Sequence, residues 1–324
     1  MKRFKSILYV NEPTVDQATA VARAVSLAEN NQADMTIVDV IPTEVVTAGI
    51  GLPPGGPISD DLRAYVESDR RKALESMVQP FSQRMQIRLN VLVGKTYLEA
   101  IRSVLKNGYD LVIKPAENPS WTNRLFGSDD LHLLRKCPCP VWLIKPSEKS
   151  NYDSILAAVD FDQSTPSLSE NDLNREILEL AAALALSDFA SLHIVHAWEA
   201  FLEGMLGAKG GMSPEGLAGY VESVHEFHRK ELNQLTEKLP GWIGKEAYDY
   251  LSPGFHLPQG PPKRVIAPLA AGLGTDLVVM GTIARTGIAG VIIGNTAEAI
   301  LDQLTCSVLA VKPPGFKTPV AVDS

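Results

Sequence analysis

The chain has 324 residues, about twice the length of an ordinary domain, so two domains are expected. Hydrophobic residues make up 45% and charged residues 21%, a balance that is typical of globular proteins and excludes a disordered chain. The 30 Lys and Arg residues against 38 Asp and Glu residues give a formal net charge of −8, which excludes a dedicated nucleic-acid-binding protein with a basic face.

The first half of the chain alternates short β-rich runs with longer helical patterns. Thr96 precedes Glu99 by three residues, which predicts a capping box at the start of a helix. Strands are expected at 6–10, 35–41, 87–93, 110–114 and 141–145, and helices at 15–30, at 60–83, from Thr96 and from about Ser128.

The second half repeats this alternation. Pro214 after Ser213 suits the first turn of a helix, because the N–H that proline lacks has no intrahelical partner there. Strands are expected at 154–159, 191–197, 246–250, 276–280 and 307–312, and helices at 173–186, from Ser213, at 262–271 and from Asn295.

Segments of the first half return in the second half in the same order. The segment 6–8 (SIL) returns at 154–156, and the segment 139–146 (CPVWLIKP) returns as 306–313 (CSVLAVKP). The offset grows from 148 to 167 residues, so the second copy carries insertions. We therefore expect a duplicated domain, with copies at 1–148 and 152–315.

Strand 276–280 is apolar on both faces, as are strands of a parallel sheet that helices cover on both sides. Alternating strands and helices of this kind predict a doubly wound α/β sheet in each copy. In such sheets ligands bind beyond the carboxyl ends of the strands, near the point where the strand order reverses.

A glycine-rich loop follows strand 276–280 and leads into a helix that starts near Asn295. Glycines let the backbone approach a ligand closely, and the free N–H groups at a helix start favour an anion. The loop is therefore a candidate phosphate cradle. The alternative is a structural connection in which Asn295 is the N-cap and Glu298 closes a capping box.

Besides the duplication, three segments are characteristic of a known family: 129–138 (DDLHLLRKCP), 280–287 (MGTIARTG) and 294–298 (GNTAE). With them the chain resembles tandem universal stress proteins of the E type over essentially its whole length. The resemblance implies two tandem flavodoxin-like, adenine nucleotide alpha hydrolase-like α/β domains, each a five-stranded parallel sheet between helices. It also implies a pseudo-dimer through the last strands of the two copies, 141–145 and 308–312.

The function that the resemblance implies is a cytoplasmic, non-catalytic stress-response module that binds ATP or another adenine nucleotide with magnesium. Many relatives bind ATP through a glycine, two residues, a glycine, nine residues, then a glycine with Ser or Thr. Those positions hold Gly281, Ala284, Gly294 and Asn295 here, so two of them depart from the pattern. The Ala284 methyl group takes up space, and Asn295 keeps an NH₂ donor without the hydroxyl, so binding should be weakened rather than abolished.

Other contacts carry over by position. Asp160 is expected to hold the ribose diol, or else to start the turn after its strand. Arg285 is expected to reach a phosphate, or else to be a solvated loop residue. The backbone after His196 is expected to meet adenine. The expected nucleotide-binding residues are Ala158, Val159, Asp160, Ala197, Met280, Gly281, Ala284, Arg285, Gly294, Asn295 and Thr296, with no catalytic residue and no metal ligand.

The first copy has a poorer site. Glu12 stands where Asp160 stands, and the segment 114–119 (KPAENP) lacks the expected glycines. Asp129 and Asp130 complement the dipole of the helix that they start, but they would repel a triphosphate there. We expect the first copy to be degenerate for nucleotide binding and to serve by pairing its sheet with the second copy.

Other functions stay open. The apolar, glycine-rich loops 42–59 and 200–212 would hold a lipid-like ligand in a scaffold without nucleotide, or would pack the halves together. At most a slow ATPase is expected, because no general base is evident. Glu222, His225 and His228 would share a metal or form an exposed polar face.

The sequence also predicts where the protein works. No apolar run approaches the roughly 20 residues that span a bilayer, and the run 7–10 is too short for an export signal. Three cysteines, an odd and small number, argue against a disulfide framework. We expect the cytoplasm, with no membrane or nucleic-acid partner; a homodimer stays open.

Overall fold

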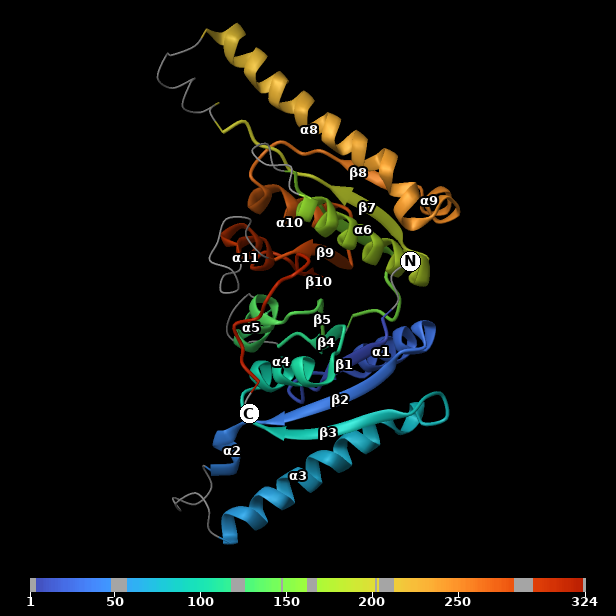
Figure 1. Ribbon diagram of the computed structural model, residues 1–324, viewed down its shortest axis with the longest axis vertical. Coiled ribbons are helices and arrows are strands. Elements are labelled where there is room, and N and C mark those ends of the chain that lie inside the picture. Colours follow the sequence, from blue (N-terminus) through green and yellow to red (C-terminus); the bar gives the residue numbers. More distant parts are fainter. Residues whose placement is uncertain are drawn as a thin grey trace. The chain divides into compact units, whose positions relative to one another are not determined.

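The computed structural model describes residues 4–47, 57–117, 126–146, 148–161, 168–201, 203, 213–282 and 294–322 (Figure 1). The chain divides into two units. One contains residues 3–150 together with 307–324, and the other contains 151–283 and 294–306. The last strand of the chain therefore groups by its contacts with the first copy.

The first copy forms a parallel sheet in the order β3-β2-β1-β4-β5. The chain runs from β1 outward to β2 and β3, then crosses to β4, so the strand order reverses between β1 and β4. The strands are β1 (Ser6–Val10), β2 (Asp34–Ile41), β3 (Ile87–Val93), β4 (Leu111–Pro115) and β5 (Val141–Ile144).

Strand β10 (Ser307–Val311) continues this sheet beyond β5 and runs antiparallel to it. Leu309 lies opposite Trp142, and Ala310 lies opposite Val141. The expected pairing between the last strands of the two copies is confirmed. It gives β5 a neighbour on its open side, so this apolar strand is not an exposed edge.

Several helices of the first copy bury an apolar stripe. Helix α1, for example, buries Ala20, Ala24 and Ala28, which recur at the helical period of about four. The helices are α1 (Ala18–Asn31), α2 (Thr43–Thr47), α3 (Pro57–Val78), α4 (Thr96–Asn107) and α5 (Ser128–Lys136), with a 3₁₀ turn at Gln79–Phe81.

The second copy forms a parallel sheet in the order β9-β6-β7-β8. The strand order reverses between β6 and β9. Its elements are β6 (Ser154–Ala158), α6 (Leu168–Asp188), β7 (Ser191–Val195), α8 (Pro214–Ile243), α9 (Lys245–Leu251), β8 (Gly254–His256), α10 (Pro262–Gly272), β9 (Leu277–Gly281) and α11 (Asn295–Leu301).

The predicted fold class of two tandem α/β domains is confirmed, and most predicted elements lie within a few residues of their places. Leu277, Val278 and Val279 are fully buried, as a strand covered on both faces requires. The Ser213 side chain accepts from the Gly216 N–H and caps α8, as Pro214 in its first turn indicated.

Two local predictions are wrong. Residues 246–250 form helix α9 rather than a strand, and the short strand β8 follows at Gly254. Gly244, at φ 93°, ends α8 and allows a second helix to start at once. The capping box is also wrong, because α4 has Lys95 as its N-cap without a side-chain cap, and Glu99 pairs with Arg102 at 2.7 Å.

None of the helices in the described part of the chain is both long and apolar enough to cross a bilayer.

Candidate functional site

The expected site residues of the second copy lie where its strand order reverses. Strand β6 ends at Ala158, just before Val159 and Asp160, and β9 ends with Met280 and Gly281. Parallel strands end at the same edge of a sheet, so the ends of these two neighbouring strands lie side by side. This is the edge at which doubly wound sheets bind ligands.

Asp160 is held by Asn174 of α6. The Asp160 N–H donates to Asn174 Oδ1 at 3.1 Å, and Asn174 Nδ2 donates to the Asp160 carbonyl oxygen at 2.7 Å. The side chain of Asp160 is 66% exposed. The backbone is therefore fixed by a buried amide, while the carboxylate is presented to solvent at the end of the strand.

Buried histidines stand behind this carboxylate. His196 Nδ1 lies 3.3 Å from the carbonyl oxygen of Val159 and 4.0 Å from Asp160 Oδ1. A carbonyl oxygen only accepts, so Nδ1 of a neutral His196 carries the proton. Nε2 must then accept from His228 Nδ1 on α8, 2.8 Å away. Burial and the neighbouring His225 hold the pKa of His228 below its ordinary value, in keeping with this neutral chain.

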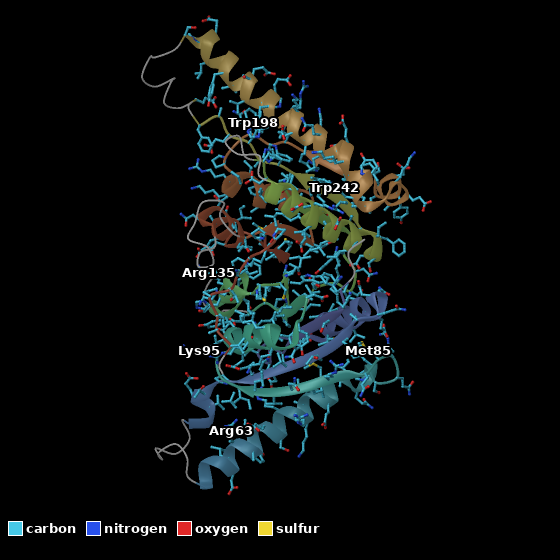
Figure 2. All side chains as sticks on the ribbon, in the orientation of Figure 1. Arg63, Met85, Lys95, Arg135, Trp198 and Trp242 are labelled. Carbon is cyan, nitrogen blue, oxygen red and sulfur yellow. The ribbon has the colours of Figure 1, made fainter. Side chains whose placement is uncertain are left out.

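The alternative metal site on α8 does not assemble. His228 points to His196, while His225 stacks on Trp198, which Figure 2 labels, with ring centroids 5.0 Å apart. Glu222 lies 3.8 Å from His225 alone. Among the described residues there is no group of three side chains suited to hold a metal ion.

The glycine-rich loop is closed at its base. The Gly294 N–H donates to the Thr282 carbonyl oxygen at 3.2 Å, so the two described residues on either side of 283–293 are hydrogen-bonded to each other. Asn295 is the first helical residue and not the N-cap. Gly294 comes directly before it and holds the N-cap position, where glycine has no side chain to form a capping bond. Asn295 and Thr296 are exposed.

Four other predicted residues remain to be placed. Ala284 and Arg285 fall outside the described residues. Ala197, expected at adenine, is buried directly after β7 and His196. Gly281 packs closely on α6, since a Cβ there would lie 3.1 Å from Leu173 Cδ2, so part of the need for glycine is internal packing.

In the first copy, protein charges fill the matching place. Lys114 stands near the end of β4, and its side chain is completely buried. Its Nζ lies 2.8 Å from Asp130 Oδ1, 3.0 Å from Glu12 Oε2 and 3.6 Å from Glu117 Oε1. These four residues, the Lys114 cluster, occupy the point where β1 and β4 reverse the strand order.

Asp130 also takes up backbone donors of this loop. Its Oδ2 accepts from the Glu117 N–H at 2.7 Å and from the Gly127 N–H at 3.1 Å. A carboxylate held by backbone amides at a helix start occupies the kind of place that a phosphate takes. The side chain of Glu117 lies so close to Gly127 that a Cβ there would be 1.6 Å from Glu117 Oε2.

The sequence pattern does not predict the Lys114 cluster as a unit, although its charged residues stand out separately. The available signal was Lys114 inside the apolar run of β4, because a lysine is fully buried only when it is paired. In the second copy Met280 stands at the position of Lys114, and Ala297 stands at that of Asp130, by the repeat that aligns Gly127 with Gly294.

The charged groups of the Lys114 cluster shift one another's pKa. Burial alone would lower the pKa of Lys114, but the carboxylates of Asp130, Glu12 and Glu117 raise it above its ordinary value. Burial and the Asp130 carboxylate raise the pKa of Glu117 to about 7. Glu117 is therefore the one member that we expect to change its charge near neutral pH.

Glu117→Gln is expected to gain stability relative to the wild type as the pH rises from about 5 to about 7. The unfolded chain loses the Glu117 proton near pH 4.5, while the folded chain keeps it to about pH 7. The wild type therefore loses stability across this window, and glutamine, which cannot ionise, does not. Urea unfolding at several pH values measures this, with the exposed Glu75→Gln as control. A constant difference across the window would contradict it.

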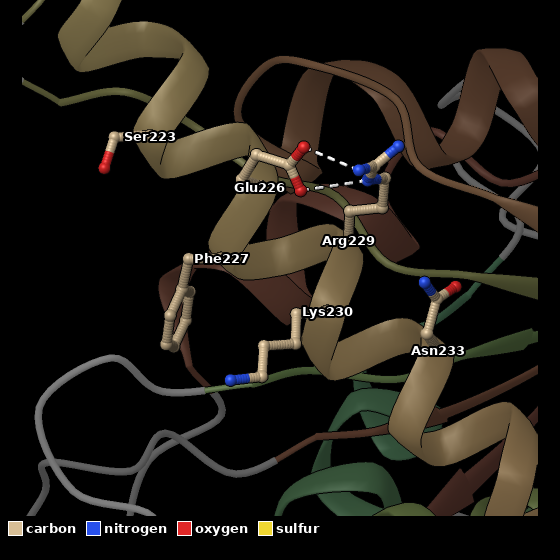
Figure 3. A pocket seen from close by; sticks show the side chains of 6 residues that line it. All are labelled: Ser223, Glu226, Phe227, Arg229, Lys230 and Asn233. Carbon is tan, nitrogen blue, oxygen red and sulfur yellow. Dashed lines mark hydrogen bonds and ion pairs between the residues drawn. The ribbon is translucent and has the colours of Figure 1, made fainter.

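None of the residues that line the hollow shown in Figure 3 belongs to the Lys114 cluster or is a predicted nucleotide-binding residue. The volume of this hollow is about 420 Å³, and its lining residues all belong to α8. Glu226 and Arg229 form an exposed ion pair across part of it. The lining side chains are Ser223, Glu226, Phe227, Arg229, Lys230 and Asn233.

The apolar loops of the alternative function fall mostly outside the described residues. Of loop 42–59, helix α2 and the start of α3 are described. Of loop 200–212, Ala200, Phe201 and Glu203 are described; Ala200 is buried, and Phe201 is 82% exposed.

Comparison with known proteins agrees with the duplicated fold. The universal stress protein family matches the chain twice, at residues 3–145 and 151–312. The chain belongs to the universal stress protein family. As a member it is a stress-response protein built from two universal stress protein domains in tandem.

Curated relatives match the chain over nearly its whole length. Universal stress protein E of Escherichia coli strain K12 is 29% identical over 100% of this chain and 98% of its own length. The universal stress protein E homolog of Haemophilus influenzae is 26% identical over 96% of this chain and 98% of its own length.

Solved structures agree as well. A functionally unknown protein from Pseudomonas aeruginosa PAO1 is 25% identical and superposes with a TM-score of 0.66, covering 96% of this chain and 93% of that chain. A universal stress protein solved in complex with cAMP matches at a TM-score of 0.27 and 18% identity, which is too low to bear on the site of this chain.

Proposed function

We propose that the chain is a non-catalytic regulatory module of the cytoplasm that binds an adenine nucleotide, ATP with magnesium, in its C-terminal copy. The supporting observation is the difference between the copies at the point where their strand order reverses. In the first copy a buried lysine and three carboxylates fill this place. In the second copy Asp160 is presented to solvent, and an alanine and a methionine replace Asp130 and Lys114.

The roles of the residues follow from their places. The Asp160 carboxylate accepts hydrogen bonds from the ribose hydroxyls, and Asn174 fixes the backbone that carries it. The backbones of Val159 and Ala197, at the ends of neighbouring strands, face the base. Ala158, Met280, Gly281, Asn295 and Thr296 line the same edge, and Ala284, Arg285 and Gly294 complete the loop that would carry the phosphates.

The first copy, 1–148, does not bind nucleotide in this proposal. Asp130 already occupies the backbone donors that a phosphate needs, and two more carboxylates surround Lys114. A triphosphate would have to displace a buried carboxylate and face like charges. The function of this copy is instead structural: its strand β5 pairs with the last strand of the second copy, 152–315.

Asp160→Ala is expected to weaken ATP binding by about tenfold to a hundredfold, since a charge-assisted hydrogen bond to the ribose is lost. Titration calorimetry with ATP and magnesium measures the affinity of the purified full chain. Asp172→Ala, an exposed carboxylate on α6, is the control and should bind as the wild type does.

Two outcomes would retire the proposal. One is no heat at high micromolar ATP with the wild-type chain. The other is equal affinity for Asp160→Ala and the wild type, which would move any binding away from the edge of β6. A stoichiometry of two nucleotides per chain would refute the proposal that the first copy does not bind nucleotide.

A further inference from the structure

Two thiols meet where α5 ends and the chain turns into β5. Cys137 and Cys139 are separated by Pro138, and their Sγ atoms lie 3.6 Å apart. Cys137 is fully buried, and Cys139 is 9% exposed. Spacing alone did not suggest this pair, because one intervening residue is not the spacing of a common redox or zinc motif.

A buried amine lies beside the pair. Lys312, directly after β10, is 4% exposed, and its Nζ donates to the carbonyl oxygen of Leu134. That carbonyl lacks its helical partner, because the residue four positions on is Pro138, which has no N–H. The Lys312 Nζ also lies 5.5 Å from the centre of the Phe316 ring. The amine is thus fixed by the helix end that carries Cys137.

The two thiols have unequal surroundings. Burial alone would raise the pKa of Cys137, but hydrogen bonds from the Cys139 thiol and backbone N–H, with the charge of Lys312, lower it below its ordinary value. The bond to Cys137, burial and the nearby charges of Cys137 and Asp110 raise the pKa of Cys139. The amine of Lys312 is held at the helix end that carries Cys137 and favours a thiolate there, so we assign Cys137 as the nucleophile, since the thiolate is the reactive form of cysteine.

We propose that Cys137 and Cys139 form a hydroperoxide-responsive dithiol, in which Cys137 is oxidised first and Cys139 closes a disulfide. The place of this pair, between α5 and the strand that pairs with β10, is separate from the nucleotide site proposed in the second copy.

The chemistry balances with the hydroperoxide as oxidant. The Cys137 thiolate attacks the terminal oxygen of ROOH, the O–O bond breaks, and the departing alkoxide takes a proton to leave as ROH. The Cys139 sulfur then attacks the sulfenic sulfur of Cys137, the S–O bond breaks, and the Cys139 proton leaves with hydroxide as water. Two thiols and one hydroperoxide give one disulfide, one ROH and one water.

The full chain contains its own control. Trypsin releases both thiols in one peptide, 137–149, and the third thiol, the buried Cys306, in another. After brief treatment with hydrogen peroxide, unfolding and alkylation, we expect peptide 137–149 to lose both alkyl groups and two mass units. Cys306 should react about tenfold more slowly, because the charge of Lys312 favours the thiolate of Cys137.

Two variants test the roles. In Cys139→Ser, no disulfide can form within the pair, so dimedone should trap a sulfenic acid on Cys137. Lys312→Met should slow oxidation of Cys137 about tenfold, because the charge that favours the thiolate is gone. Circular dichroism checks that both variants fold, and Cys306→Ser should behave as the wild type does.

The proposal fails if peptide 137–149 keeps both alkyl groups, or if Cys137 and Cys306 are oxidised at equal rates. It also fails if Cys137→Ser leaves Cys139 to be trapped by dimedone as fast as Cys137 is in Cys139→Ser, because the order of oxidation would then be wrong.

Discussion

Replacing Lys114 with methionine is expected to lower the free energy of unfolding by about 3–5 kcal/mol. The ammonium of Lys114 is fully buried and faces Asp130, Glu12 and Glu117. Methionine fills a similar volume, so the loss is electrostatic: the buried Asp130 and the partly buried Glu12 and Glu117 lose their counter-charge. The expected cost is therefore that of breaking a buried ion pair rather than that of a cavity.

Urea unfolding followed by circular dichroism measures this change. Lys72→Met, an exposed lysine on α3, is the matched control and should change stability by less than about 0.5 kcal/mol. The double variant Lys114→Met, Asp130→Leu should recover part of the loss, since it removes a buried charge along with its partner. Recovery stays partial because the N–H groups of Glu117 and Gly127 lose their acceptor. A loss below about 1 kcal/mol for Lys114→Met would show that the cluster is not a stabilising unit.

The strands could be predicted from the sequence because their signal is local. Apolar runs bounded by polar residues place β1, β2 and β3 within one residue of their bounds. The run 246–250 shows the limit of such reasoning. The sequence predicts a strand there, but Gly244 ends α8 and lets the chain turn into α9.

Helix starts could be predicted less well, because a cap depends on one backbone conformation. Ser213 caps α8 through its side chain, whereas Thr96 and Asn295 are first helical residues and do not cap. The residues before them, Lys95 and Gly294, hold the cap position without a side-chain bond. A capping residue type therefore indicates a helix start to within one position only.

The family resemblance places Asp160 in the candidate site by its position after a strand, and its role stays a prediction. The residues that support Asp160 could not be predicted from the sequence. Asn174, which holds it, comes from the interior of α6, and the bond between His196 and His228 joins residues 32 positions apart. Contacts between distant segments leave no mark in the local pattern, so only the fold reveals them.

Trp142→Ala is expected to cost about 3–5 kcal/mol of the free energy of unfolding, the range for removing a large buried aromatic side chain. Trp142 is 1% exposed on β5, and the guanidinium carbon of Arg23 lies 5.9 Å from the centre of its ring. Leu309 of β10 lies directly opposite. The tryptophan thus fills space between the sheet, α1 and the strand that arrives from the second copy.

A double-mutant cycle separates the pairing of β5 with β10 from burial alone. Residues directly opposite on antiparallel strands have neighbouring side chains, so Trp142→Ala and Leu309→Ala should be non-additive by about 0.5–3 kcal/mol. The matched cycle pairs Trp142 with Leu74, which is equally buried but sits on α3 against β2 and β3, at the other end of the strand order. That cycle should be additive within about 0.5 kcal/mol. Additivity in both cycles would mean that the last strand does not pair with β5. The proposed structural role of the first copy, which depends on this pairing, would then be wrong.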